Sequence, residues 1–258
     1  MRVLLLGGTA EARTLAARLN PHVDVISSLA GRVPDPALPA GQVRIGGFGG
    51  VDGMRQWLCD EHVDAVVDAT HPFAATITAH AAQVCRELGL PHLVLTRPPW
   101  DPGDAIVVAS DAEAAKRVEQ QSFQRVFLTT GRSGVAAFAD SKAWFLIRAV
   151  TAPDFETLPR RHQLVLSRGP YHYDGEHALL REHRIDVLVT KNSGGKMTRA
   201  KLDAAAALGI PVVMVARPPL PAAVTTVGTV EEAAEWAAGK ADAALRAPTR
   251  KSGLDGAV

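Results

Sequence analysis

The stretch that decides the predicted fold is V-L-L-L-G-G-T-A-E-A-R, residues 3–13. Its four apolar residues predict a buried parallel strand, and the good helix formers after Thr9, with Glu11 in the first turn, predict a helix. Gly7 and Gly8 join the two elements. Glycine lets a backbone approach a ligand closely, and the first N–H groups of a helix attract an anion, so this turn suits a phosphate group. The match to G-x-G-x-x-G is poor, however, and an ordinary connection that binds nothing would look the same.

Length and composition indicate a globular protein of two domains. The chain has 258 residues, of which 47% are hydrophobic and 21% charged, and its net charge of +1 gives no general attraction to nucleic acid. No apolar run approaches the roughly 20 residues that span a bilayer, and residues 3–6 are too short for a signal-peptide core. We therefore expect a cytoplasmic protein with no membrane contact. Cys59 and Cys85 lack C-x-x-C spacing and are expected to be buried, reduced thiols.

The second half of the chain repeats the plan of the first. Four stretches match at a nearly constant spacing: residues 2–8 with 125–131, 63–67 with 185–189, 90–99 with 210–219, and 111–115 with 229–233. Strands that alternate with helices predict parallel sheets, and the repetition predicts two similar units. The predicted fold class is therefore α/β, with two Rossmann-like parallel-sheet domains related by an internal repeat and a cleft between them. We place the domains at residues 1–121 and 122–246, followed by a disordered tail over residues 247–258.

Two further loops of the first domain are candidates for cofactor contacts. The second predicted strand ends in S-S-L-A-G-R, where an NAD-binding domain usually has an acidic residue. Ser27, Ser28 and Arg32 would favour the 2′-phosphate of NADP, since a carboxylate would repel that group and a guanidinium binds it bidentately. The glycine-rich turn around Gly47 and Phe48 would let backbone lie against a flat group. The alternatives are a polar loop whose serines cap a turn and a mobile glycine loop.

The loop T-H-P-F-A places Thr70 and His71 at the carboxyl end of a predicted fourth strand. Functional side chains commonly lie at this position in α/β sheets. A lone histidine there is also often a structural cap. The chain has no H-E-x-x-H and no clustered Cys/His spacing, so we predict no metal site.

The charge of the chain is unevenly distributed. Residues 1–121 hold 10 Lys/Arg and 14 Asp/Glu, whereas residues 122–258 hold 18 and 13. Several polar side chains of the second half follow predicted strand ends and so fall toward one sheet edge: Arg132, Ser133, Arg168, Lys191, Ser193 and Lys196. Charge-assisted hydrogen bonds contribute about 1.5–3 kcal/mol each, so this edge would suit a polycarboxylate. A solvated basic face would give the same count.

Four motifs together carry a family resemblance: G-G-T-A-E-A-R at 7–13, D-A-T-H-P-F-A at 68–74, T-T-G-R at 129–132, and K-N-S-G-G at 191–195 followed by Thr198 and Lys201-Leu202. In this order and spacing the chain resembles the precorrin-6A reductases of cobalamin biosynthesis over nearly its whole length to about residue 246. The resemblance implies an NADPH-dependent reduction of one double bond in the macrocycle of precorrin-6A, giving precorrin-6B. It also implies two Rossmann-like domains without the usual glycine fingerprint.

The resemblance also implies residue roles. Gly7, Gly8, Thr9 and Glu11 would line the pyrophosphate turn, Ser28 and Arg32 would meet the 2′-phosphate, and Thr70 and His71 would lie near the nicotinamide. The carboxylates of the tetrapyrrole would be bound by Arg132, Ser133, Arg168, Lys191, Ser193 and Lys196. His71 and Tyr171 are candidate proton donors, with a water molecule or a substrate carboxyl group as open alternatives.

Two other functions stay open on sequence alone. One is another NADP-dependent oxidoreductase that acts on a smaller anionic substrate. The other is a non-catalytic protein that binds a tetrapyrrole or a nucleotide. The sequence carries no prediction of the oligomeric state.

Overall fold

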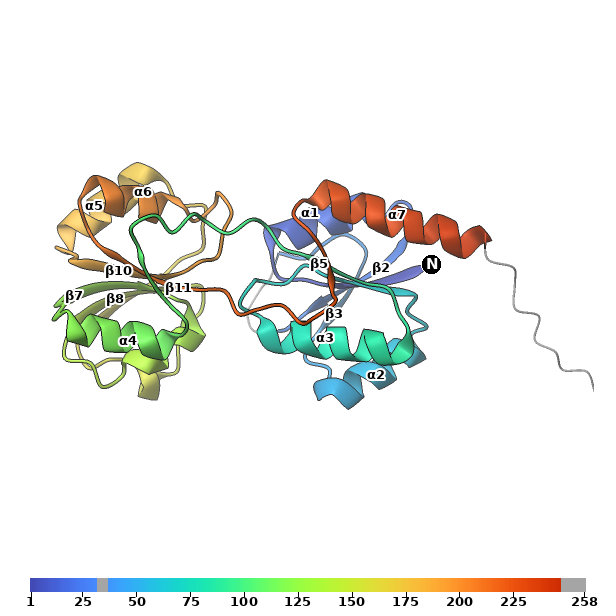
Figure 1. Cartoon of the computed structure of the whole chain (residues 1–258), viewed down its shortest axis with the longest axis horizontal. Coiled ribbons are helices and arrows are strands. Elements are labelled where there is room, and N and C mark those ends of the chain that lie inside the picture. Colours follow the sequence, from blue (N-terminus) through green and yellow to red (C-terminus); the bar gives the residue numbers. More distant parts are fainter. Residues whose placement is uncertain (32–36, 247–258) are drawn as a thin grey trace, which may run out of the picture. The chain divides into compact units, whose positions relative to one another are not determined.

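The computed structural model describes residues 1–31 and 37–246 and divides the chain into two compact units (Figure 1). The first unit contains Met1–Thr96 and the chain from Leu220 onward, and the second contains Arg97–Pro219. The expected disordered tail and Arg32 both lie outside the described residues.

The first unit is built on a parallel sheet with the strand order β12-β5-β4-β1-β2-β3. Its strands are β1 (Arg2–Leu6), β2 (Asp24–Leu29), β3 (Gln42–Ile45), β4 (Ala65–Asp68), β5 (His92–Leu95) and β12 (Thr225–Val227). Counted from the edge at β3, this is the 3-2-1-4-5-6 order of dinucleotide-binding folds. The strand order therefore reverses between β1 and β4, and this switch point is where such sheets bind ligands.

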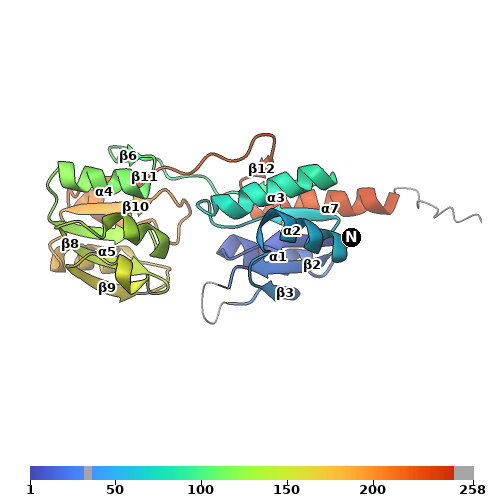
Figure 2. The same cartoon turned by 90° about the horizontal axis from the view of Figure 1, so that it is seen from below.

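Helices cover both faces of the first sheet (Figures 1 and 2). They are α1 (Ala10–Leu19), α2 (Gly50–Asp60), α3 (Ala75–Leu88) and α7 (Val230–Arg246). Because side chains alternate along β1, Leu5 packs with Leu15 of α1 on one face, while Leu4 packs with Leu58 of α2 on the other. All four leucines are at most 1% exposed, as expected for a central strand that is covered on both sides.

The second unit has a parallel sheet of the same kind, with the order β6-β11-β10-β7-β8-β9. Its strands are β6 (Ile106–Val108), β7 (Arg125–Thr129), β8 (Trp144–Ala149), β9 (His162–Leu166), β10 (Val187–Lys191) and β11 (Val212–Val215). Its helices are α4 (Asp111–Gln120), α5 (Tyr173–Glu182) and α6 (Ala200–Ala207), with the short 3₁₀ segments η1 (Arg132–Phe138) and η2 (Phe155–Thr157). Its switch point lies between β7 and β10. The predicted fold class is confirmed for both sheets.

The sixth strand of each sheet is exchanged between the two units. β6 follows β5 along the chain but pairs with β11, with Ile106 opposite Val213. β12 follows β11 but pairs with β5, with Thr225 opposite Leu93. The domain boundary predicted at residue 121 therefore differs from the structure, in which the units change at Arg97 and at Leu220. The prediction assumed continuous domains, and a three-residue strand carries no sequence signal for its partner.

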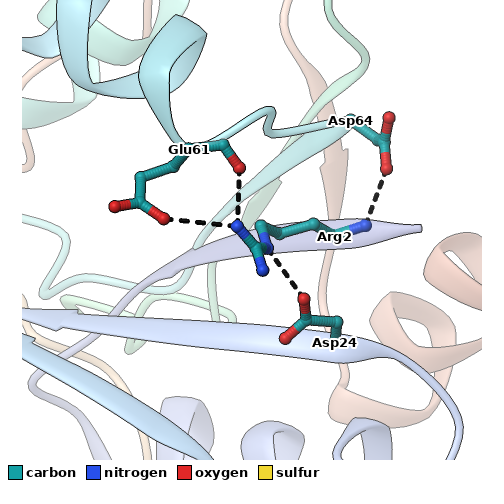
Figure 3. Close-up of polar contacts among 4 residues, drawn as sticks. All are labelled: Arg2, Asp24, Glu61 and Asp64. Carbon is teal, nitrogen blue, oxygen red and sulfur yellow. Dashed lines mark hydrogen bonds and ion pairs between the residues drawn. The ribbon is translucent and has the colours of Figure 1, made fainter.

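A clamp at the amino ends of the strands ties β1 to its neighbours (Figure 3). The amide of Arg2 donates to Asp64 Oδ2 at 2.7 Å, and its Nε donates to Asp24 Oδ2 at 2.7 Å. Its Nη1 donates to the Glu61 carbonyl at 2.9 Å. This arginine therefore joins β1, β2 and the segment that enters β4.

The corresponding arginine of the second unit makes the corresponding contacts. The amide of Arg125 donates to Asp186 Oδ1 at 3.0 Å, and its Nε donates to the His183 carbonyl at 2.5 Å. In both units the arginine binds an aspartate, and it also binds the carbonyl of the residue three positions before that aspartate. The sequence repeat is thus also a repeat of polar contacts, at the sheet edge remote from the switch point.

The two cysteines differ from each other. Both are free, and Cys85 is buried against the first sheet, where burial raises the pKa of its thiol to about 12. Cys59 is exposed, so its expected burial is wrong. It lies on the solvent side of α2, next to the buried Leu58, because neighbouring helical residues face different directions.

Candidate functional site

The turn between β1 and α1 lies at the switch point of the first sheet. The amide of Gly7 donates to the Ser28 carbonyl at 2.9 Å, which holds this turn against β2. Gly8 is exposed and has a φ of 111°, a backbone conformation that favours glycine. Thr9 caps α1, since its hydroxyl oxygen accepts from the Ala12 amide at 3.1 Å. The N-terminus of α1 is therefore fixed beside an open glycine turn, which is an arrangement that attracts anions.

The loop after β4 lies next to this turn. The hydroxyl of Thr9 donates to the Ala69 carbonyl at 2.7 Å and joins the two loops. Thr70 follows, and His71 is exposed, with its Nδ1 accepting from the Phe73 amide at 3.3 Å. The structure thus places the loop that carries Thr70 and His71 beside the glycine turn.

Strand β3 adds to this edge an arginine, Arg44, that the sequence analysis did not select. Arg44 lies opposite Ser28 in the β2–β3 register, and its Nη1 donates to Ser28 Oγ at 2.8 Å. The same guanidinium donates to the carbonyls of Gly46 and Gly47, each at 3.1 Å. It also lies over the ring of Phe48, 3.8 Å from the centroid. Ser28, Gly47 and Phe48 are therefore joined by one cation.

The charge of Arg44 has no anionic partner among the described residues. Its described contacts are a hydroxyl, two carbonyls and the rings of Phe48 and Trp57. Partial burial lowers the pKa of this guanidinium, since burial disfavours the charged form. A bound anion would offset that cost. The signal in the sequence was an arginine in a short strand just before a glycine-rich turn.

Three predicted polar residues of this edge are buried: Thr9 is 8% exposed, Ser27 1% and Ser28 6%. Ser27 lies inside β2 and is 1% exposed, because the strand continues to Leu29 rather than ending at the serines. Its expected contact with a cofactor is therefore not supported by this arrangement. Glu11 is half-buried in the first turn of α1, where the positive end of the helix dipole stabilises its carboxylate.

In the second unit, the predicted cations divide into exposed and buried ones. Arg132, Arg168 and Lys196 are exposed on the loops that follow β7, β9 and β10, and Ser133 is exposed next to Arg132. All three loops leave the carboxyl edge of the sheet. Lys191 is buried at the end of β10 and pairs with Asp111 at 3.2 Å. Lys191 therefore already has a carboxylate of its own.

Two arginines that the sequence analysis did not select hold the loop after β10. Arg97 Nε donates to the Ser193 carbonyl at 2.8 Å, and Arg217 Nη2 donates to the same oxygen at 3.1 Å. Arg217 also donates to the Arg97 carbonyl at 2.8 Å. Both come from the R-P-P motifs of the repeat, which was the available signal. Ser193 is thus fixed by its backbone.

Tyr171 belongs to the loop after β9. Its hydroxyl donates to the Ser167 carbonyl at 3.0 Å, and its amide donates to the Met197 carbonyl at 3.1 Å. Arg148 lies over its ring, 3.7 Å from the centroid. Tyr171 therefore joins the loops that carry Arg168 and Lys196.

Other kinds of site are not indicated within the described residues. Among them, no group of three or more histidine, cysteine, aspartate or glutamate side chains could hold a metal ion. None of the described helices is both long and apolar enough to cross a bilayer.

Fold and site define the class of Rossmann-like dinucleotide-fold proteins, here with the unit present twice. The family model described as "Precorrin-6x reductase CbiJ/CobK" matches residues 2–238, and the chain belongs to this family. The resemblance predicted from the sequence is thereby confirmed.

Individual relatives agree with this membership. The chain is 75% identical over 238 residues to the precorrin-6A reductase of Mycobacterium tuberculosis, with 92% of this chain and 98% of that protein covered. It is 56% identical over 240 residues to the precorrin-6A reductase of Rhodococcus erythropolis, with 91% and 96% covered. A solved structure of CobK precorrin-6A reductase matches with a TM-score of 0.85 and 37% identity, and the match covers 93% of this chain and 97% of that one.

Proposed function

We propose that this protein reduces precorrin-6A to precorrin-6B with NADPH, as a step of cobalamin biosynthesis. The reduction adds a hydride and a proton across one double bond of the macrocycle. The family and the names of the similar proteins support the reaction. The carboxyl edges of the two sheets support binding of the cofactor by the first unit and of the substrate by the second. We also place the protein in the cytoplasm, where a biosynthetic reductase of this family would have its reaction partners.

The single observation that carries the cofactor assignment is the pairing of Arg44 with Ser28 at 2.8 Å. It lies at the carboxyl end of β2, where dinucleotide folds bind the adenosine ribose. An arginine and a hydroxyl there suit a 2′-phosphate, and no acidic residue of the described chain pairs with this arginine. The open turn at Gly8 and the N-terminus of α1 would then hold the pyrophosphate.

The second unit supports an anionic substrate. Arg132, Arg168 and Lys196 are exposed on loops at one edge of its sheet, with Ser133 beside them. Precorrin-6A is a polycarboxylate, so these cations would orient it through its side chains rather than through the reacting ring. Holding two large reactants in a fixed geometry supplies several kcal/mol of the barrier.

A bound reduced nicotinamide supplies the hydride. The chain itself has to hold the reacting carbon in place, exclude water and deliver a proton to the adjacent carbon. His71 is the better of the two proposed proton donors, because its ring is exposed beside the glycine turn of the first unit. The hydroxyl of Tyr171 is already committed to the Ser167 carbonyl at 3.0 Å.

The proposal is tested by anaerobic incubation of the purified protein with NADPH and precorrin-6A. Loss of reduced-nicotinamide absorbance, with a tetrapyrrole product heavier by two hydrogens, is the expected result. Omission of the tetrapyrrole and replacement of NADPH by NADH are the controls. Tight binding of both ligands without turnover would instead favour the non-catalytic alternative. Turnover of small anionic acids but not of precorrin-6A would favour the other oxidoreductase.

A further inference from the structure

Three charged side chains are buried together in the second unit, away from the exposed cations. Arg148 of β8 is 6% exposed, Glu176 of α5 is 3% exposed, and Lys201 of α6 is 4% exposed. Charged residues are almost never fully buried unless they are paired. The burial of these three charges therefore needs a physical explanation.

Two of the three charges neutralise each other. Arg148 donates to both carboxylate oxygens of Glu176, at 2.5 and 2.8 Å. This bidentate pair uses both oxygens of the only carboxylate that raises the pKa of Lys201. Lys201 is therefore the surplus cation of the group.

The contacts of Lys201 are with one segment and the residue that supports it. Its Nζ donates to the Thr198 carbonyl at 2.7 Å and lies 4.7 Å from the centroid of the Trp100 ring. Trp100 in turn donates from its indole to the Gly195 carbonyl at 2.8 Å and from its amide to Asn192 Oδ1 at 2.8 Å. Lys201 thus contacts both the segment 192–199 and its indole support.

The segment 192–199 is the loop that carries Ser193 and Lys196. It also receives the amide of Tyr171 at the Met197 carbonyl, 3.1 Å away. Any shift at Thr198 would be transmitted to Lys196, two residues earlier, and to the loop of Tyr171. Because Lys201 holds the Thr198 carbonyl, it also limits the positions that the exposed Lys196 can take.

Stability alone does not explain a lysine at this position. A methionine would fill the same apolar space without a desolvation cost, and such replacements of buried charges are often neutral or stabilising. The pKa of Lys201 falls from 10.5 to about 7, mainly through burial and also through Arg148, while Glu176 opposes the shift. The residue is thus costly to the fold, and its benefit has to lie elsewhere.

We infer that Lys201 is a positioning residue that holds the segment 192–199 in the geometry in which it binds the carboxylates of the substrate. The inference rests on the proposed function for the identity of that substrate. Lys201 itself touches no substrate; it acts through the Thr198 carbonyl and the Trp100 ring.

The test compares Lys201→Met with Arg199→Met in the full-length protein. Arg199 is a matched control, because it immediately precedes the same helix but is exposed, and within the described part of the chain its side chain pairs only with Asp203, at 3.2 Å. Backbone hydrogen exchange of the segment 192–199 is measured first, without any ligand. We expect exchange of this segment about tenfold faster in Lys201→Met and unchanged in Arg199→Met, while exchange in the sheet strands of both variants is no faster than in wild type.

Kinetics then separate positioning from general structure. In Lys201→Met the KM for precorrin-6A should rise about tenfold, while the KM for NADPH and kcat change less than about twofold. Lys201→Arg keeps a hydrogen-bond donor, so its KM for precorrin-6A should rise less than that of Lys201→Met. If Lys201→Met does not fold, Lys201→Arg takes its place in the test.

Two outcomes would overturn the inference. Exchange in the segment 192–199 that equals the wild-type rate would show that Lys201 does not hold it. Faster exchange with an unchanged KM for precorrin-6A would show that the anchored geometry does not serve the substrate. A wild-type protein that does not consume precorrin-6A would refute the proposed function instead, and the exchange measurement would still decide whether Lys201 anchors the segment.

Discussion

Thr70 donates two hydrogen bonds to a single carboxyl oxygen of Asp68, one from its amide at 2.9 Å and one from its hydroxyl at 2.6 Å. Asp68 is the last residue of β4 and is 1% exposed. Its other oxygen is buried with no hydrogen-bond partner among the described residues. The carboxyl group therefore serves the local turn, and that turn presents His71.

This geometry predicts different effects of two substitutions at Asp68. Asp68→Asn keeps the oxygen that accepts from Thr70 and should leave the KM for NADPH within about threefold of wild type. Asp68→Ala leaves two donors unsatisfied and should lower the free energy of unfolding by about 2–3 kcal/mol. Urea denaturation and steady-state kinetics check both. Equal losses in the two variants would contradict the role of the turn.

Arg44 is predicted to set the preference for NADPH. Arg44→Met removes the cation beside Ser28 and should raise the KM for NADPH by more than about tenfold, with a smaller effect on NADH, which lacks the 2′-phosphate. Arg55→Met is the control, because Arg55 is on α2 and pairs with Glu87 at the surface. Arg32→Ala, chosen from sequence alone, is measured alongside. If Arg44→Met loses NADPH and NADH equally, this assignment fails.

His71 is predicted to supply the proton that follows hydride transfer. His71→Ala should lower kcat about a hundredfold or more, because general acid catalysis contributes at least that factor, while Tyr171→Phe should change kcat only slightly. Single-turnover rates of NADPH oxidation check the chemical step directly. A His71→Ala enzyme within a few-fold of wild type would exclude this residue as the acid.

The fold was largely predictable because its signals are local. Apolar runs such as residues 3–6 mark strands, and the repeat marks two copies of one sheet order. The exchange of β6 and β12 was not predictable, because which sheet a three-residue strand joins depends on tertiary contacts alone.

The part of the candidate site that is formed by backbone groups was predictable from the sequence. Gly7, Gly8 and Thr9 follow from the strand–turn–helix pattern, which fixes their place at the switch point. Arg44 was missed because its partner is sixteen residues away and becomes visible only in the β2–β3 register. Lys191 was selected as a ligand because the sequence does not show that Asp111, eighty residues earlier, pairs with it.

Lys201 predicts a pH dependence of stability. The pKa of its amine falls from an ordinary 10.5 to about 7 in the folded chain, mainly through burial and also through Arg148, with Glu176 opposing the shift. Between pH 7 and 10 the unfolded chain thus binds more protons, so this residue makes stability rise with pH, by up to about 1.4 kcal/mol per unit. Lys201→Met should lack this slope and gain most over wild type near pH 7. Urea denaturation of both proteins at pH 7, 8 and 9 tests this, and parallel curves would contradict it.

Gly194 is predicted to be irreplaceable for steric reasons. It has a φ of 67°, and a Cβ there would collide with the Pro98 carbonyl oxygen and the guanidinium of Arg217. Gly209 is the matched control, because its φ of 63° is similar but a Cβ there meets nothing within 4 Å. Gly209→Ala should cost about 1 kcal/mol from backbone strain alone, and Gly194→Ala about 2 kcal/mol more.

The same collision should also reach the substrate site. Arg217 holds the Ser193 carbonyl, so displacing its guanidinium would move the residue next to Gly194. Gly194→Ala should therefore raise the KM for precorrin-6A, whereas Gly209→Ala should not. Thermal unfolding and steady-state kinetics on the two variants separate strain from collision. Equal destabilisation by both substitutions would mean that the contacts with Pro98 and Arg217 can relax, and that the glycine is required only for its backbone conformation.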